Sequence, residues 1–196
     1  MSPRAPGAKG GAARYIAFLR AINVGGHTVT MDRLRRLFGK MGFRGVETFI
    51  ASGNVVFDAP GSTATAEKTI EAALGKALGY DVATFVRTPA ELAAVTAYEA
   101  FDAADVARAR TQCVGFLAEP LGKAAAAKLL ALRTEVDDFR VHGREIHWLC
   151  RVGQSESDFS NAVFEKTTGV RATFRNINTV RKLAAKYAPP ARGSTT

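Results

Sequence analysis

The segments RYIAFLRAINVGG (residues 14–26) and VETFIASGNVVFDA (residues 46–59) decide the fold of this chain. The first contains a short apolar run at residues 15–21 before a glycine-rich loop, which predicts a strand. The second predicts strands at residues 46–50 and 55–58, joined by the tight turn Ser52-Gly53-Asn54, because glycine and asparagine tolerate a positive φ angle. We expect the rest of the chain to pack around these two polar turns.

Helical periodicity appears between and after these strands. Apolar residues recur at helical spacing over residues 31–41, and a second such pattern covers residues 63–78. A further strand is predicted at residues 82–87. The resulting order, strand-helix-strand-strand-helix-strand, is that of the ferredoxin-like split unit.

The same order returns in the second half of the chain. After a helix at residues 90–97 and an Ala- and Asp-rich connector, the expected elements are strands at residues 112–117, 136–141, 145–150 and 172–174, and helices at residues 121–132, 157–168 and 178–188. The sequence therefore predicts an α+β fold with two ferredoxin-like (β-α-β-β-α-β) units in tandem and an extra C-terminal helix. The expected organisation is a disordered N-terminal tail at residues 1–13, the first unit at 14–88, a helical connector at 89–110, the second unit with the C-terminal helix at 111–188, and a disordered tail at 189–196.

The topology of the first unit brings its two polar turns to one edge of the sheet. In this unit the strand order is 4-1-3-2, so all neighbouring strands are antiparallel, and the helical crossover makes the first and second strands parallel. The end of the first strand and the hairpin between the second and third strands therefore meet at the same edge. Near this edge we expect Arg20, Asn23, Gly25, Gly26, Ser52, Gly53 and Asn54.

Composition excludes several classes of protein. The 196 residues are 47% hydrophobic, which suffices for a core without disulfide or metal cross-links. No run approaches the roughly 18 apolar residues of a membrane span, and residues 1–13 lack the apolar segment of a signal peptide. Cys113 and Cys150 have no metal-ligand spacing, so we expect a cytoplasmic protein with reduced thiols, no metal and no cofactor.

The net charge of +9 is unevenly distributed along the chain. Residues 1–46 carry nine basic residues and one acidic residue, residues 47–165 carry eleven basic and seventeen acidic residues, and residues 166–196 carry seven basic residues and no acidic one. Two basic ends around an acidic middle indicate either an anionic partner or simply a solvated surface. If the two ends meet in space, their mutual repulsion predicts a bound anion between them.

Three motifs, RAINVGG, SGNVVF and RNINTVRKL, are more specific than this general pattern. Through them the chain resembles the bacterial family of domain of unknown function 1697, a group of uncharacterised cytoplasmic proteins. The match covers Tyr15 to Phe57 and Arg175 to Leu183, with Ala21 in place of the usual glycine and Ile177 in place of a common tryptophan. The resemblance implies an α+β fold with ferredoxin-like halves, and it implies no established activity.

The C-terminal motif Arg175-Asn176-Ile177-Asn178 runs from a short strand into a helix, which Asn176 or Asn178 would cap. Free amides at a helix start, with arginines nearby, suit a phosphate or carboxylate; a purely structural cap is the alternative. The turn INVGG fits neither common phosphate-binding motif, so it is either a phosphate cradle or a tight turn that needs glycine. Ser52-Gly53-Asn54 is likewise explained by a hairpin alone.

Our hypothesis is that these three motifs converge into one electropositive, asparagine-rich pocket. The arginines would hold an anion and the amides would orient it. The predicted ligand-binding residues are Arg20, Asn23, Gly25, Gly26, Ser52, Gly53, Asn54, Arg175, Asn176 and Asn178.

Several functional classes stay open. The first is a binding protein for a phosphate-bearing ligand, either a nucleotide or a nucleic acid. Others are an enzyme or sensor for a small anionic metabolite and a protein-interaction scaffold. A serine hydrolase built on Ser52 and His27 lacks a nucleophile elbow and an orienting carboxylate. Stacking of RNA on the first sheet is not supported, because its third strand carries only Phe57.

Three further residues of the second unit have expected places. We interpret Trp148 and Phe174 as core residues. Asp137, beside Asp138 at a strand start, is expected to be solvated surface, with no second carboxylate motif to pair with it. The oligomeric state is left undetermined by the sequence.

Overall fold

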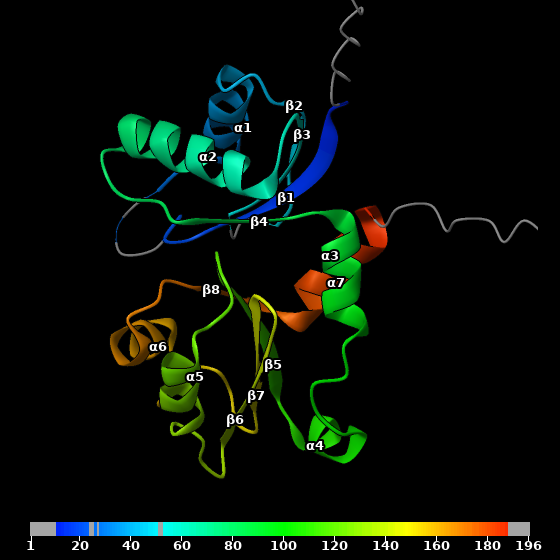
Figure 1. Cartoon of the computed structure of the whole chain (residues 1–196), viewed down its shortest axis with the longest axis vertical. Helices are drawn as coiled ribbons and strands as arrows, with labels where there is room; N and C mark the ends of the chain where they lie inside the picture. Colours follow the sequence, from blue (N-terminus) through cyan, green and yellow to red (C-terminus); the bar gives the residue numbers. More distant parts are fainter. Residues whose placement is uncertain (1–10, 24–25, 27, 51–52, 188–196) are drawn as a thin grey trace, which may run out of the picture.

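Two four-stranded antiparallel sheets organise the part of the chain that the structure describes (Figure 1). A computed structural model describes residues 11–23, 26, 28–50 and 53–187. The two predicted tails lie outside these residues except for residues 11–13.

The first sheet and its helices form the N-terminal unit, which comprises β1 (Ala13–Leu19), α1 (Met31–Lys40), β2 (Arg44–Thr48), β3 (Asn54–Ala59), α2 (Thr63–Leu78) and β4 (Thr84–Arg87). The C-terminal unit comprises β5 (Thr111–Phe116), α5 (Lys123–Leu130), β6 (Asp137–His142), β7 (Glu145–Cys150), α6 (Asn161–Thr168) and β8 (Thr173–Asn176). The units are connected through α3 (Pro89–Ala97) and α4 (Ala103–Arg108), and α7 (Ile177–Tyr187) follows β8.

The strand order is β2-β3-β1-β4 in the first sheet and β6-β7-β5-β8 in the second, with every neighbouring pair antiparallel. The strand order predicted for the N-terminal unit is therefore confirmed, and the C-terminal unit repeats it. The helices differ from the prediction in two places. The connector contains α4, whose first turn is capped by the Asp102 carboxylate, and the helix predicted from residue 157 begins at Asn161, where the Ser160 hydroxyl caps it.

From Tyr15 to Leu19, β1 is buried on both faces, which explains why this part of the strand is an apolar run. Because side chains alternate along a strand, Ala17 and Leu19 face α1 and α2, whereas Ile16 and Phe18 face the opposite way. In Figure 1 the helices α1 and α2 cover the outer face of the first sheet, and α5 and α6 cover the outer face of the second.

The inner faces of the two sheets share one apolar cluster. The Phe18 ring of β1 stacks on the Phe116 ring of β5, with their centroids 3.9 Å apart. Helices α3 and α7 lie side by side and close one side of this cluster, to which Leu92 and Leu183 contribute (Figure 1). The two units therefore form a joint core, in which each sheet is buried on both faces.

A buried ion pair crosses between the units beside this core. Arg87, at the end of β4, is 1% exposed, and its Nε donates to Oε1 of Glu145 at 2.6 Å. Its Nη2 donates to the carbonyl oxygens of Leu117 at 2.8 Å and Arg144 at 3.0 Å. One side chain of the N-terminal unit thus contacts two segments of the C-terminal unit, the residue after β5 and the start of β7.

The two cysteines lie close together on neighbouring strands. β5 and β7 are antiparallel, and Thr111 pairs with Cys150 while Cys113 pairs with Trp148. Both thiols are buried and free, and burial raises the pKa of Cys113 to about 12.

In the described part of the chain, no helix is both long enough and apolar enough to span a membrane.

Candidate functional site

The end of β1 meets the β2–β3 hairpin at one edge of the first sheet, as the topology predicts. The Leu19 amide donates to the Gly53 carbonyl at 2.8 Å. Gly53 has a φ of +73°, and a Cβ atom there would lie 3.2 Å from the Leu19 carbonyl oxygen. Glycine is therefore required here both by its backbone angle and by the close approach of β1.

Asn54 and Arg175 join two motifs that are far apart in the sequence. Asn54 is fully buried; its Nδ2 donates to the Phe49 carbonyl at 3.0 Å, and its Oδ1 accepts from Arg175 Nε at 2.7 Å. Arg175 Nη2 donates to the Leu19 carbonyl at 2.9 Å, although the two residues are 156 positions apart. The SGN turn, the end of β1 and the RNINTV motif are thus held together by one guanidinium group.

The Arg175 guanidinium makes further hydrogen bonds within its own strand, β8. Its Nη1 donates to the Thr173 hydroxyl at 2.7 Å and to the Phe174 carbonyl at 2.9 Å. Burial lowers the pKa of Arg175 to about 10, because desolvation disfavours the charged form. The acceptors named here are neutral oxygens, and they fix the orientation of the guanidinium.

Arg20 already has an anionic partner within the protein. Its guanidinium makes a two-pronged ion pair with the Glu165 carboxylate of α6, with distances of 2.7 Å from Nε and 2.5 Å from Nη2. Glu165 Oε1 also accepts from the Ala172 amide at 3.1 Å. Arg20 therefore links the two units, and its charge is largely balanced before any ligand arrives.

A cleft of about 460 Å³ opens between the units at this point. Its lining includes three of the predicted residues, namely Arg20, Asn23 and Arg175. Asn23 is exposed, has a φ of 61°, and accepts the Val29 amide on Oδ1 at 2.6 Å. The side chain of Asn23 therefore stabilises the turn after β1 at the rim of the cleft.

The cleft also contains polar residues that the sequence did not identify, among them Gln154, Asn161 and Thr173. The Oδ1 atom of Asn161 is buried and has no hydrogen-bond partner within the described residues. The sequence did not identify Asn161 as a cleft residue, because the predicted helix begins at residue 157, four residues before the observed start at Asn161. A pattern of apolar spacing cannot show that such a helix start faces the opposite unit.

The other predicted residues have different roles. The Asn176 side chain caps α7 by accepting the Asn178 amide at 2.9 Å, which confirms Asn176 as the cap. Asn176, Asn178 and Gly26 are exposed and are not among the described residues that line the cleft. Gly53 and Asn54 are buried behind Arg175, while Gly25, Ser52 and His27 lie outside the described residues.

The basic ends of the chain are partly neutralised by the acidic middle. In addition to Arg20 with Glu165, Arg14 pairs with Asp58 at 2.8 Å and Lys186 pairs with Glu47 at 2.9 Å. Part of the repulsion expected between the two ends is thus offset by ion pairs within the protein.

Asp137 is buried, contrary to the expectation of solvated surface. It is 3% exposed, and its carboxylate accepts from Trp148 Nε1 at 2.7 Å and from the Ser157 hydroxyl at 2.8 Å. Trp148 lies in the core as predicted, and Phe174 packs against the same cluster. Tryptophan needs a partner for its N–H group when buried, which explains the buried carboxylate.

Among the described residues, no group of three or more His, Cys, Asp or Glu side chains is arranged to hold a metal ion.

The fold and this cleft together define an α+β protein with two antiparallel sheets that enclose a joint core and a polar cleft at their junction. The chain belongs to the family described as protein of unknown function DUF1697, whose model matches residues 12–147. This confirms the family resemblance seen in the sequence motifs.

A solved structure with a similar fold is that of the conserved bacterial protein SP0830 from Streptococcus pneumoniae. The two chains are 22% identical with a TM-score of 0.69, and the similarity covers 90% of this chain and 98% of the other. At this identity the likeness concerns the fold alone. No curated protein shows significant sequence similarity to the chain.

Proposed function

We propose that this protein binds a small phosphate-bearing ligand, a sugar phosphate or nucleotide, in the cleft between its two units. The main support for this proposal is that Arg20 and Asn23 of the RAINVGG motif line the same cleft as Arg175 of the RNINTV motif.

The identical strand order of the two sheets supports a further inference about architecture. We infer two ferredoxin-like units, at about residues 14–88 and 111–188, joined by a helical connector.

Arg175 is the proposed anchor for the phosphate. Its guanidinium is oriented by neutral oxygens and carries its charge in a partly desolvated position, where electrostatic attraction is stronger than in water. A phosphate next to it would favour the charged form and reverse the effect of burial on its pKa. Arg20 contributes less, because Glu165 already balances it.

Asn161 supports a ligand that carries hydroxyl groups as well as phosphate. A buried carbonyl oxygen without a partner costs free energy, and a hydroxyl donor in the cleft would remove that cost. Sugar phosphates and nucleotides combine both groups.

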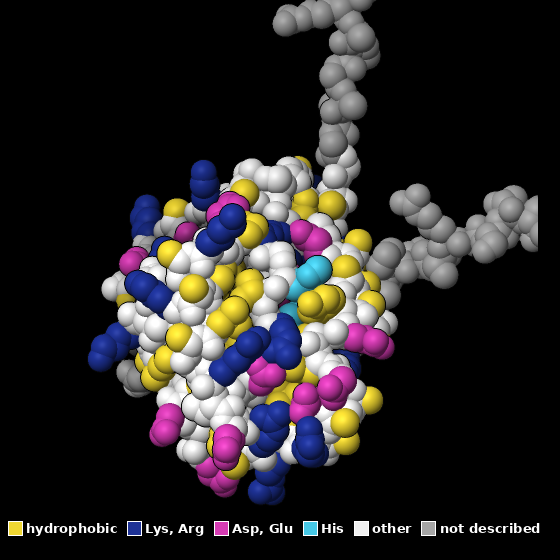
Figure 2. All heavy atoms as spheres, turned by 60° about the horizontal axis from the view of Figure 1, so that its bottom comes forward, with side chains coloured by type: hydrophobic (Ala, Val, Ile, Leu, Met, Phe, Trp, Pro, Cys, Tyr) yellow, Lys and Arg dark blue, Asp and Glu magenta, His cyan; other side chains and the backbone are white. Residues whose placement is uncertain are grey.

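A small ligand is favoured over a nucleic acid by the covered sheet faces and by one face of the molecular surface. RNA-recognition modules bind with an open sheet face, whereas Phe18 and Phe116 here stack on each other between the two sheets. Figure 2 shows basic and acidic side chains interspersed on the face that it presents, with no continuous basic stripe. Nucleic-acid binding depends on such a stripe.

The proposal is tested by adding inorganic phosphate, ribose 5-phosphate and nucleoside monophosphates to the purified protein. Ligand binding should raise the melting temperature, and phosphorus NMR should show broadened signals. Arg175→Gln should weaken binding by about 10–100-fold, because a hydrogen bond to a charged group contributes about 1.5–3 kcal/mol. Arg171→Gln is the matched control, since Arg171 is exposed and is not among the described residues that line the cleft.

Asn161→Ala separates ligand binding from stability. Its Oδ1 makes no hydrogen bond within the described residues, so the change should leave the melting temperature of the free protein nearly unchanged. It should still weaken binding of the sugar phosphate, but not of inorganic phosphate. The proposal fails if no phosphate-bearing probe binds, or if Arg175→Gln binds them as the wild type does. A steep salt dependence with an oligonucleotide would instead favour nucleic acid.

A further inference from the structure

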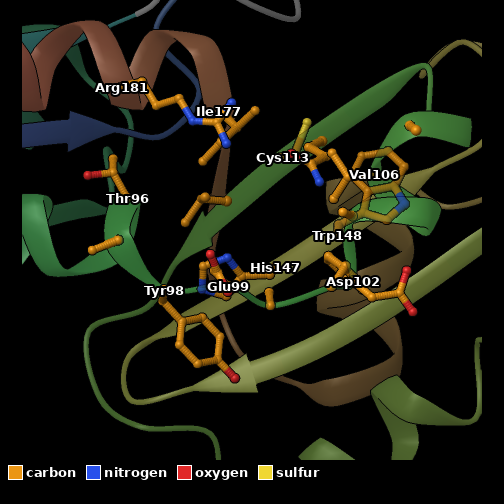
Figure 3. A pocket seen from close by; sticks show the side chains of 17 residues that line it. Thr96, Tyr98, Glu99, Asp102, Val106, Cys113, His147, Trp148, Ile177 and Arg181 are labelled. Atoms are coloured by element: carbon orange, nitrogen blue, oxygen red, sulfur yellow. The ribbon is translucent and has the colours of Figure 1, made fainter.

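A second pocket of about 570 Å³ lies beneath the segment that connects α3 to β5 (Figure 3). Its walls come from this segment, from β5 and β7 of the C-terminal sheet, and from the start of α7. Much of the lining is apolar and includes Ala97, Ala100, Val106, Val114 and Ile177. The size and the apolar walls are those of a small-molecule site.

A buried imidazole nitrogen without a hydrogen-bond partner among the described residues is part of this lining. His147 is 5% exposed, and its Nε2 atom has no hydrogen-bond partner among the described residues. Burial lowers the pKa of His147 to about 4, with a smaller effect of the neighbouring His142, so the ring is neutral at pH 7. A buried polar atom of this kind is uncommon in native structures, and a bound ligand is one explanation.

Two opposite charges also line the pocket. Arg181 comes from α7 and Glu99 from the connecting segment, and neither has a hydrogen bond or ion pair within the part of the chain that the structure describes. Figure 3 shows Arg181 and Ile177 on one side of the pocket, with Glu99 and His147 on the other. Asp102 is different, because its carboxylate accepts the Asp105 amide at 2.7 Å as a helix cap.

Tyr98 closes the histidine end of the pocket. Its ring stacks on His142 with centroids 4.0 Å apart and lies 5.0 Å from the His147 ring. Tyr98 is 37% exposed, which is unusual for a large apolar side chain in this protein. The aromatic surface of Tyr98 adds to the apolar lining next to the neutral imidazole.

We propose that this pocket binds a free amino acid with an apolar or aromatic side chain. Arg181 pairs with the carboxylate of the ligand, and Glu99 pairs with its ammonium group. The neutral His147 ring supplies a hydrogen bond without adding charge, and the alanine-rich wall contacts the side chain of the ligand. A simple carboxylate would pair with Arg181 alone and a simple amine with Glu99 alone, whereas a zwitterion pairs with both charged side chains of the lining.

Binding is measured by the fluorescence of Trp148, which is the single tryptophan of the chain and contributes to the pocket lining. The probes are L-leucine and L-phenylalanine, with phenylalaninamide, which lacks the carboxylate, and N-acetylphenylalanine, which lacks the ammonium group. We expect the two free amino acids to bind at millimolar concentration or below. Each analogue should bind about tenfold more weakly, because it loses one charge-assisted hydrogen bond.

Two variants test the assignment of the charges. Arg181→Gln should abolish the preference for phenylalanine over its amide, and Glu99→Gln should abolish the preference over the N-acetyl form. Lys182→Gln is the control, because Lys182 is the next residue on α7, is exposed and is not among the residues that line the pocket. All three changes concern exposed side chains, so the variants are expected to remain folded.

The outcome is decisive in either direction. Loss of the matching preference in both variants, with Lys182→Gln unchanged, supports a zwitterion site. The proposal is overturned if no free amino acid changes the fluorescence, if both analogues bind as tightly as phenylalanine, or if Glu99→Gln has no effect. The last result would indicate a plain carboxylate ligand. Because Trp148 also borders the inter-unit cleft, an effect of Arg175→Gln on amino-acid binding would assign the signal to that cleft and likewise overturn the proposal.

Discussion

Replacing Arg87 by methionine should destabilise the protein strongly, because it removes the cation of a buried ion pair. The Arg87 side chain is 1% exposed and that of Glu145 is 11% exposed, and their contact is 2.6 Å long. Methionine keeps most of the aliphatic volume but leaves the Glu145 carboxylate without its counter-charge. It also leaves the Leu117 carbonyl without the donor at 2.8 Å.

The expected cost is about 3–5 kcal/mol, the usual range for breaking a buried pair from one side. For a chain of this length, 1 kcal/mol shifts the melting temperature by about 2–4 °C, so the decrease should be on the order of 10 °C. Urea unfolding followed by circular dichroism would measure the free energy directly. A second change, Glu145→Gln, removes the uncompensated charge and should restore part of the loss.

Arg108→Met is the matched control for this experiment. Arg108 pairs with Asp105 at 2.8 Å, but its side chain is 67% exposed. An exposed pair contributes about 0–1 kcal/mol, so the control should change stability little. If Arg87→Met costs less than about 1 kcal/mol, or if Glu145→Gln restores nothing in that background, the buried pair does not hold the two units together.

Two further predictions concern single residues. Ala21 has a φ of 58°, a left-handed conformation that favours glycine, so Ala21→Gly should raise the free energy of unfolding by about 0.5–1 kcal/mol in urea titrations; a decrease would refute the strain argument. Burial lowers the pKa of His147 to about 4, below its unfolded value near 6.5, so its contribution to stability is full above pH 6.5 and is lost as the pH falls towards 4. Between pH 6.5 and pH 4 the free energy of unfolding of the wild type should fall by an amount on the order of 3 kcal/mol. His147→Phe should show a smaller fall, and the same dependence of the free energy of unfolding on pH in both proteins would contradict this prediction.

The sequence determined the elements and the local topology of each sheet. Apolar runs and helical spacing predicted the eight strands of the described residues and most of their helices, because burial on a sheet face or helix face imposes a period on the chain. The strand order of the N-terminal unit followed, since antiparallel neighbours and one crossover leave few alternatives. The meeting of β1 with the SGN turn, seen in the bond from Leu19 to Gly53, was therefore predictable.

The short helix α4 was missed for a physical reason. It contains six residues and no buried side chain, so no apolar period marks it. Its cap, Asp102, was visible only as part of an acidic connector. The burial of Asp137 was missed in a similar way, because its partners Trp148 and Ser157 come from two other segments.

Only the tertiary structure decided how the two units and the charges combine. Arg20 and Arg175 were both expected to hold a ligand, yet Glu165 neutralises the first while neutral oxygens orient the second. The pairing of Arg175 with Leu19 joins residues 156 positions apart, and no local pattern records such a contact. Periodicity reports which face of an element is buried, whereas the partner on that face is set by long-range packing. For that reason the strand order within each sheet could be predicted from the sequence, whereas the partners of Arg20 and Arg175 at the cleft between the units could not.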